Sequence, residues 1–203
     1  MEIATPSTEE VSKYLSRWDL LDNYVYQESS LKKLFSKTYP LNIDLDDILI
    51  KVCSLNDFYS TNIFSPFVVA KHILSLNIDG ALHNNDLGIV NKIAKVKMNG
   101  GKIINFYSFA TKYCSHHKPT VYPIYDSYLE KVLMYFKKKD HFSNFYKSDL
   151  KVYVNYHNVL LDFRKHYGLE MFDLKQIDRY LWQLGKEHFL PKKLRKFNET
   201  AAS

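Results

Sequence analysis

The stretch KIINFYSFATKYCSHHKPTVYPIYDSYL, residues 102–129, carries the strongest structural signal in this chain. Apolar side chains recur in it at steps of three and four residues, with no proline until Pro119, and this spacing predicts a helix over residues 103–116. We expect one face of the helix to be buried. The opposite face carries hydroxyl, ammonium and imidazole groups that need water or a ligand: Ser108, Lys112, Ser115 and His116.

Asp126 follows a turn framed by prolines. Pro123 lacks an N–H and biases Tyr122 towards extended backbone, so the preceding helix cannot continue through the turn. Asp126 and Ser127 then precede an apolar run that predicts a second helix over residues 127–137, with Asp126 as its N-cap. Capping alone is one interpretation of Asp126. The other is a carboxylate that also faces a cleft, and the two roles are compatible.

Helical periodicity continues along the rest of the chain, in which glycine and proline are sparse at six each. The pattern predicts an all-α fold: a compact body of many helices with a cleft between two helical lobes. Residues 1–190 are expected to form a single domain, and residues 191–203 a basic, flexible tail. The other helices are expected at residues 8–18, 25–35, 45–55, 66–76, 86–96, 150–166 and 174–187, with a turn-rich connection at 77–88.

Composition and charge narrow the function classes. The 203 residues are 46% hydrophobic, which supports a sizeable core, and the net charge of +6 fits an anionic partner such as DNA. The N-terminus lacks a secretion signal and no apolar run approaches membrane-spanning length, so we expect a cytoplasmic monomer without membrane contact. Basic residues cluster at Lys137, Lys138 and Lys139, and again at Lys192, Lys193, Arg195 and Lys196.

The two cysteines, Cys53 and Cys114, form no C-x-x-C pair and no four-ligand set. We therefore expect buried, reduced thiols, no metal site and no cofactor. His116 and His117 are adjacent, so they point to different sides of a helix and do not make a metal pair.

Two successive glycines, Gly100 and Gly101, lie directly before the polar-striped helix. Glycines let main-chain amides approach a ligand closely, and a helix beginning just beyond them favours a phosphate. The alternative is that they make only a tight turn between two helices.

The order of these features resembles the helix-hairpin-helix DNA glycosylases, the superfamily that contains endonuclease III and the 8-oxoguanine DNA glycosylases. NGGK at residues 99–102, the helix after it and HKPTVYPIYDSY at residues 117–128 are similar to that family's hairpin, helix and proline loop leading to an aspartate. CSLN at residues 53–56, before DFYSTNI and the helix FVVAKHIL, looks like the family's early turn between helices. The glycines depart from a clean G-x-G pattern, and the iron–sulfur cysteines of many relatives are absent.

The resemblance implies a DNA glycosylase that excises a damaged or modified base from double-stranded DNA, with a possible second activity as an abasic-site lyase. It makes Asp126 the catalytic carboxylate, and Lys112 or Lys102 the amine that attacks the sugar. We prefer Lys112, whose ammonium would be costly to leave idle on an aromatic helix, although a snorkelling surface lysine is the alternative. The residues expected to contact DNA are Asn56, Gly100, Gly101 and Lys102; a plain turn or cap role is the alternative for Asn56.

The chemistry explains why these residue types are wanted. Cleavage of an N-glycosidic bond develops positive charge on the deoxyribose, which a carboxylate stabilises, and a lysine whose pKa burial has lowered can attack C1′. The base must leave the stack, so an aromatic pocket is needed. The expected pocket residues are Tyr107, His116, Tyr125 and Trp182, each of which could equally belong to the core, and the last helix could fold back towards the cleft carrying Asp178 and Trp182.

Two other classes of function fit the same residues. The first is a non-catalytic basic helical module that binds DNA, and the second is a protein-interaction scaffold. The kind of base, and a role in repair or in defence against modified foreign DNA, stay open at this level.

Overall fold

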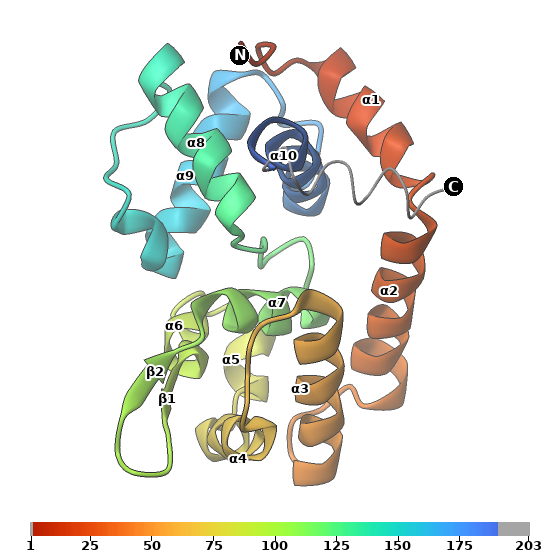
Figure 1. Ribbon diagram of the computed structural model, residues 1–203, viewed down its shortest axis with the longest axis vertical. Helices are drawn as coiled ribbons and strands as arrows, with labels where there is room; N and C mark the ends of the chain where they lie inside the picture. Colours follow the sequence, from red (N-terminus) through yellow and green to blue (C-terminus); the bar gives the residue numbers. More distant parts are fainter. Residues whose placement is uncertain (1, 191–203) are drawn as a thin grey trace.

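The computed structural model describes residues 2–190, which contain ten α-helices, two short helical segments of other types and one pair of strands (Figure 1). The prediction of an all-α fold is confirmed, since the strands are only three residues each. The elements in chain order are α1 (Thr8–Trp18), α2 (Asp22–Lys33), the π-helical η1 (Leu34–Thr38), α3 (Leu45–Tyr59), α4 (Pro66–Leu76), α5 (Asp79–His83), α6 (Ile89–Ala94), β1 (Lys95–Lys97), β2 (Ile103–Asn105), α7 (Tyr107–His117), α8 (Ser127–Asp140), the 3₁₀ segment η2 (Asp149–Lys151), α9 (Tyr153–His166) and α10 (Leu174–Phe189).

The helices are arranged in two halves, as Figure 1 shows. The upper half holds α1, α8, α9 and α10, in which α10 packs against both α8 and α1. The lower half holds α3 to α7 and the strands, with α3 packed on α4 and α6 on α7. Helix α2 follows α1 out of the upper half and contacts α3 and α7 of the lower one. Helix α2, near the start of the chain, and helix α10, near the end of the described residues, therefore both pack against helices from the middle of the sequence.

Helix α7 lies at the boundary between the halves and is the most enclosed helix of the molecule (Figure 1). Nine of its eleven residues are buried, including the polar Thr111, Lys112, Ser115 and His116. The expectation of one buried face is therefore too narrow, because the polar stripe is covered as well as the apolar one. Burial of a polar group costs free energy unless the group has a partner, so the partners of these four side chains indicate what each one does.

The Gly100–Gly101 segment differs from the prediction. It is the turn of an antiparallel β-hairpin, in which Lys95 pairs with Asn105, and not a direct turn between helices. Both glycines have positive φ, +91° and +86°, which L-residues rarely adopt. Helix α7 consequently begins at Tyr107, not at residue 103, because Ile103–Asn105 are paired as a strand.

Other helix boundaries also differ from the predicted ones. The connection at residues 77–88 contains α5, and α6 begins only at Ile89. Helix α2 begins at Asp22, three residues earlier than expected, and continues into η1. The thiol of Cys114 is buried as expected, but Cys53 is exposed.

Asn42, Lys51 and Tyr113 form a buried polar cluster in the lower half. Asn42 is 1% exposed, and its Oδ1 accepts hydrogen bonds from Lys51 Nζ at 2.7 Å and from Tyr113 OH at 2.6 Å. Lys51 Nζ also donates to the main-chain oxygens of Tyr39 and Leu41, at 3.1 and 2.8 Å. Burial lowers the pKa of Lys51 to about 8. All of its donors have acceptors, so this lysine anchors the connection between α2 and α3.

The predicted tail at residues 191–203, with its four basic residues, lies outside the described residues. Within residues 2–190, no helix combines the length and the apolar character needed to cross a membrane.

Gly185 sets how closely α10 approaches α8. A Cβ built on it would lie 2.7 Å from the main-chain oxygen of Tyr128, and backbone cannot yield as a flexible side chain can. We expect Gly185→Ala to lower the free energy of unfolding by about 1–3 kcal/mol, measured by urea denaturation.

Gly80 provides the matched control. It is also helical, and a Cβ there meets nothing within 4 Å. Gly80→Ala should leave stability unchanged or raise it by up to about 1 kcal/mol, since alanine favours helix. Equal stability of the two variants would contradict the close packing of α10 on α8.

Candidate active site

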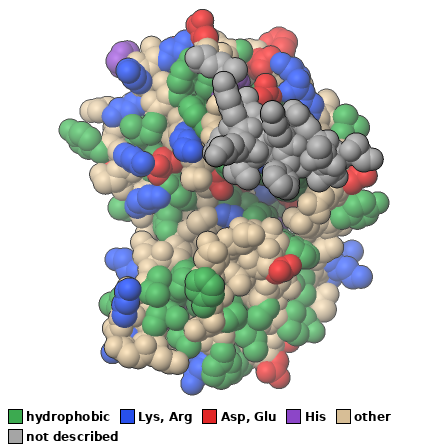
Figure 2. Space-filling model, viewed as in Figure 1, with side chains coloured by type: hydrophobic (Ala, Val, Ile, Leu, Met, Phe, Trp, Pro, Cys, Tyr) green, Lys and Arg blue, Asp and Glu red, His purple; other side chains and the backbone are tan. Residues whose placement is uncertain are grey.

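The surface is hollowed between the upper and lower halves (Figure 2). A first cavity between elements of both halves, which we call the chamber, has a volume of about 610 Å³ counting its part open to solvent. The chamber is lined by Trp18, Tyr24, Gln27, Glu28, Phe58, Tyr59, Lys112, Ile124, Asp126, Lys175, Asp178, Arg179 and Trp182.

A second cavity, which we call the groove, adjoins the chamber and has a volume of about 740 Å³ counted in the same way. Three residues line both cavities, namely Tyr59, Lys112 and Asp126. Lys112 and Asp126 therefore stand at the junction of the two. The other residues of the groove are mostly polar: Ser60, Thr61, Asn62, Ser108, Tyr125, Ser127, Glu130 and Lys151.

Asp126 caps α8, as the sequence predicted. Its Oδ1 accepts a hydrogen bond of 2.7 Å from the N–H of Tyr128, and its backbone is extended. The carboxylate is nevertheless half-buried at the wall of both cavities. Asp126 therefore caps α8 and faces a cleft at the same time, so both roles considered for it are present.

The proline turn before Asp126 is anchored from α9. Tyr153 OH donates to the main-chain oxygen of Pro123 at 2.8 Å, and Tyr156 OH donates to that of Ile124 at 2.6 Å. Both tyrosines are fully buried. Because the turn cannot shift without breaking these bonds, Asp126 is held in place relative to α9.

Lys112 is only 4% exposed, so the interpretation as a snorkelling surface lysine is wrong. Its Nζ donates to Ser108 Oγ at 2.6 Å and lies 5.2 Å from the centre of the Tyr59 ring. Burial lowers the pKa of Lys112, while the charges of Asp126 and Asp178 oppose this shift. A lowered pKa increases the fraction of neutral amine, which is the nucleophilic form.

Asp178 is a further titratable residue of the chamber, supplied by α10. It is 4% exposed, and burial raises its pKa to about 6, against the charges of Lys175 and Lys112. Lys175 Nζ lies 3.7 Å from its carboxylate. The sequence suggested only that the last helix could bring Asp178 towards the cleft, and this placement is confirmed.

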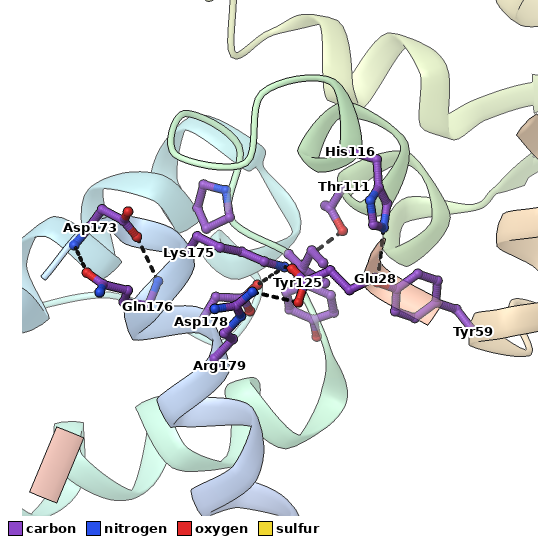
Figure 3. A network of polar contacts seen from close by, with 12 residues as sticks. Glu28, Tyr59, Thr111, His116, Tyr125, Asp173, Lys175, Gln176, Asp178 and Arg179 are labelled. Atoms are coloured by element: carbon purple, nitrogen blue, oxygen red, sulfur yellow. Dashed lines mark hydrogen bonds and ion pairs between the residues drawn. The ribbon is translucent and has the colours of Figure 1, made fainter. Parts of the chain in front are cut away.

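An ion cluster joins α2 to α10 at the chamber wall, as Figure 3 shows. Glu28 of α2 lies 3.1 Å from Lys175 Nζ and 2.6 Å from an Arg179 nitrogen. The positive charges of Lys175 and Arg179 lower the pKa of Glu28 against the opposing effect of its burial. These residues were missed at the sequence level, because no local pattern links positions about 150 apart.

Aromatic rings form one side of the chamber. Trp182 packs edge-on against Trp18 and Tyr24, with ring centres 5.8 and 4.8 Å away. Trp182 thus lies where the sequence placed it, in the wall of an aromatic pocket. Trp18 and Tyr24 belong to the N-terminal segment, which the sequence analysis left without a site residue.

The other expected pocket residues are distributed differently. Tyr125 lines the groove, and its hydroxyl donates to Glu130. Tyr107 is buried against the Tyr125 ring, 5.0 Å between centres, and lines neither the chamber nor the groove within the described residues. His116 lines a neighbouring cavity and shares a hydrogen bond of 3.0 Å with Tyr59 OH, while burial lowers its pKa to about 3, so the ring is neutral. Only Trp182 of the four therefore faces the chamber.

The hairpin separates Lys102 from the site. Lys102 is exposed beside Gly100 and Gly101, and none of the three lines the chamber or the groove. The structure therefore brings Lys112 together with Asp126, while Lys102 lies on a different surface.

Asn56 is occupied within the turn between α3 and α4. Its Oδ1 accepts from Thr61 Oγ1 at 2.9 Å and from the N–H of Ile63 at 2.8 Å, and its Nδ2 donates to the oxygen of Ile63. These bonds shape the segment whose residues 60–62 line the groove. Asn56 thus acts as the turn residue that the sequence analysis named as its alternative.

The basic run at the end of α8 also has partners within the protein. Lys137 Nζ donates to the main-chain oxygen of Phe145, and Lys139 Nζ to that of Ile3 at 3.2 Å. Glu130, which lines the groove, pairs with Lys151 of the groove at 3.3 Å and with Lys147 at 2.8 Å.

Comparison with known proteins gives a family and a relative. The family described as "HI_0787_N, N-terminal domain" matches residues 10–121, a segment that includes Lys112 but ends before Asp126. An uncharacterized protein of Haemophilus influenzae (strain ATCC 51907 / DSM 11121 / KW20 / Rd) is 49% identical over 146 residues, which cover 71% of this chain and 69% of that protein. No solved structure matches.

Proposed function

The chain belongs to the family described as HI_0787_N, N-terminal domain, and we propose that it is a DNA glycosylase that excises a damaged or modified base. The observation that carries the proposal is that a buried lysine, Lys112, and a helix-capping carboxylate, Asp126, both line the junction where an aromatic chamber meets a polar groove. The resemblance to helix-hairpin-helix glycosylases supports the same function, although a β-hairpin stands where that motif has its turn.

The two cavities suit the two parts of a flipped nucleotide. The base enters the chamber, where rings such as Trp182 offer it a stacking surface, and its sugar and phosphates lie in the groove. This places C1′ at the junction, beside Lys112 and Asp126. Lys151 in the groove, together with Lys147 paired to Glu130 beside it, supplies positive charge for the neighbouring phosphates beyond what Glu130 neutralises.

The reaction then follows from the two groups at the junction. The neutral amine of Lys112 forms a bond to C1′ while the bond from C1′ to the base nitrogen breaks, and its electron pair leaves with the base, which takes up a proton. The carboxylate of Asp126 stabilises the positive charge that develops on the sugar. Transfer of a proton from the attached nitrogen to O4′, as the C1′–O4′ bond breaks, opens the sugar ring and leaves a protonated Schiff base, from which strand scission can proceed.

The test is a set of duplexes, each with one oxidised, deaminated, alkylated or hypermodified base: 8-oxoguanine, uracil, hypoxanthine, ethenoadenine and glucosylated hydroxymethylcytosine. We expect at least one duplex to acquire an abasic site, seen as a strand break at that position after alkali. Retention of all duplexes without any abasic site would support the non-catalytic DNA-binding module instead.

DNA binding has its own measurement. Affinity for duplex should fall steeply as salt rises from about 50 to 200 mM, because phosphate contacts release counterions. Binding that ignores salt would argue against DNA as the partner and for an interaction scaffold.

A further inference from the structure

Lys112, Asp126 and Asp178 differ in which of the two cavities they line. Lys112 and Asp126 line both the chamber and the groove, whereas Asp178 lines the chamber alone. If the sugar occupies the junction and the base occupies the chamber, Asp178 faces the base and not the sugar. The reaction described above leaves the source of the proton for the departing base unassigned.

The surroundings of Asp178 suit a carboxyl that exchanges a proton near neutral pH. It is buried, and the N–H of Ile124 donates to it, while Lys175 lies 3.7 Å away. Glu28 from α2 opposes its ionisation, and Lys112 from α7 favours it. Burial dominates and raises the pKa of Asp178 to about 6. Other titratable groups that interact with it are the hydroxyls of Tyr59, Tyr153 and Tyr156.

The two carboxyls of the site differ in burial and in position. Asp126 is half-buried at the junction of the two cavities, opposite the sugar, and accepts an N–H. Asp178, enclosed at the base side, is suited to carry a proton. This division of tasks between two acids is a general device for running acid catalysis near neutral pH.

We propose that Asp178 is a catalytic residue that donates its proton to the departing base; this rests on the glycosylase function proposed above. As the bond from C1′ to the base nitrogen breaks and its electron pair moves onto the base, the Asp178 O–H bond breaks and the proton bonds to the base. The base leaves neutral, and Asp178 is left as a carboxylate beside Lys175. A proton from solvent restores the acid before the next turnover.

The experiment compares two substrates. One is the duplex from the panel that the protein cuts best, and the other is the same duplex with a pre-formed abasic site made by removal of uracil. Asp178→Asn should slow base excision about 100-fold or more, because general acid catalysis contributes roughly 10²–10⁴-fold. Borohydride trapping on the abasic duplex, which has no base to protonate, should stay within about twofold of wild type, because the same nucleophile acts there.

Several outcomes overturn the assignment. Equal loss on both substrates would make Asp178 a structural or lysine-positioning residue, and unchanged excision would remove it from the reaction. A wild-type protein that neither excises nor traps would refute the glycosylase function itself, and the Asp178 assignment with it. Asp162→Asn, an exposed aspartate of α9 that bonds Ser143, is the matched control and should change neither assay.

The pH profile supplies a second readout that a structural role would not move. Loss of the Asp178 proton above pH about 6 opposes the gain in neutral Lys112 amine as the pH rises. Excision by the wild type should therefore increase with pH less steeply than excision by Asp178→Asn, which lacks the acid. Lys175→Met removes a charge that favours the Asp178 carboxylate, so loss of the acid should begin at higher pH in that variant. Profiles of equal steepness for the wild type and Asp178→Asn would contradict the proposal.

Discussion

Lys112→Gln should abolish the covalent complex that borohydride traps between the protein and an abasic duplex, and should slow base excision by at least about a thousandfold. Loss of an attacking nucleophile removes the reaction path itself, and such losses are among the largest that single substitutions produce. Glutamine retains much of the length and polarity of the side chain, and no ammonium remains to be buried in the chamber. The measurement is single-turnover cleavage, together with gel detection of the trapped adduct.

Lys102→Gln is the control for this experiment. Lys102 was the second candidate for the nucleophile, and it lies exposed on the hairpin, outside the chamber and the groove. It should trap as the wild type does, with at most a small loss of DNA affinity. Trapping that disappears with Lys102→Gln and survives Lys112→Gln would reverse the assignment. Excision without any trapped species in the wild type would mean that water, and not an amine, attacks the sugar.

Asp126→Asn should reduce base excision by about 100- to 1,000-fold while leaving DNA retention nearly unchanged. The substitution removes the charge opposite the sugar, and electrostatic stabilisation of a transition state has roughly this value per group. Asparagine caps a helix about as well as aspartate, so α8 should keep its N-terminal hydrogen bond from Tyr128. A thermal melt coinciding with that of the wild type would show that the cap is intact.

Asp126→Ala separates the two roles of this residue. Alanine cannot cap, so this variant should lose about 1 kcal/mol of stability in addition to the activity. If capping were the sole role of Asp126, Asp126→Asn would excise at the wild-type rate and only Asp126→Ala would be impaired. The pair of variants therefore tests the carboxylate independently of the helix.

The helices were predictable because their apolar spacing and caps are local. The hairpin was not, since two strands of three residues are too short to show alternation, and Gly100–Gly101 fits a turn between helices equally well. The extent of burial of α7 was also hidden. Its polar residues are covered by segments such as α2 and α3 that pack on it from far along the chain.

In the candidate site, too, residues with a local sequence signal could be predicted, and residues placed by tertiary packing could not. Lys112 and Asp126 are fourteen positions apart, within one helix and one turn, so periodicity and capping could single them out. Trp182 was named from the amphipathic last helix, and its place in the chamber follows from the packing of α10. Glu28 and Trp18 could not be found, because the return of α1 and α2 towards α10 is a tertiary event with no local signature.

The composition of the chamber has a consequence for how such a protein could change its target. Lys112 comes from α7 and Asp126 from the start of α8, whereas Trp18 and Tyr24 come from the end of α1 and the first turns of α2. On the proposed function, exchange of side chains where α1 meets α2 would reshape the receptor for the nucleobase and leave the groups against the sugar unchanged. Selectivity and reactivity would then be separable, and libraries randomised at residues 18–27 would be the route to variants that recognise other lesions.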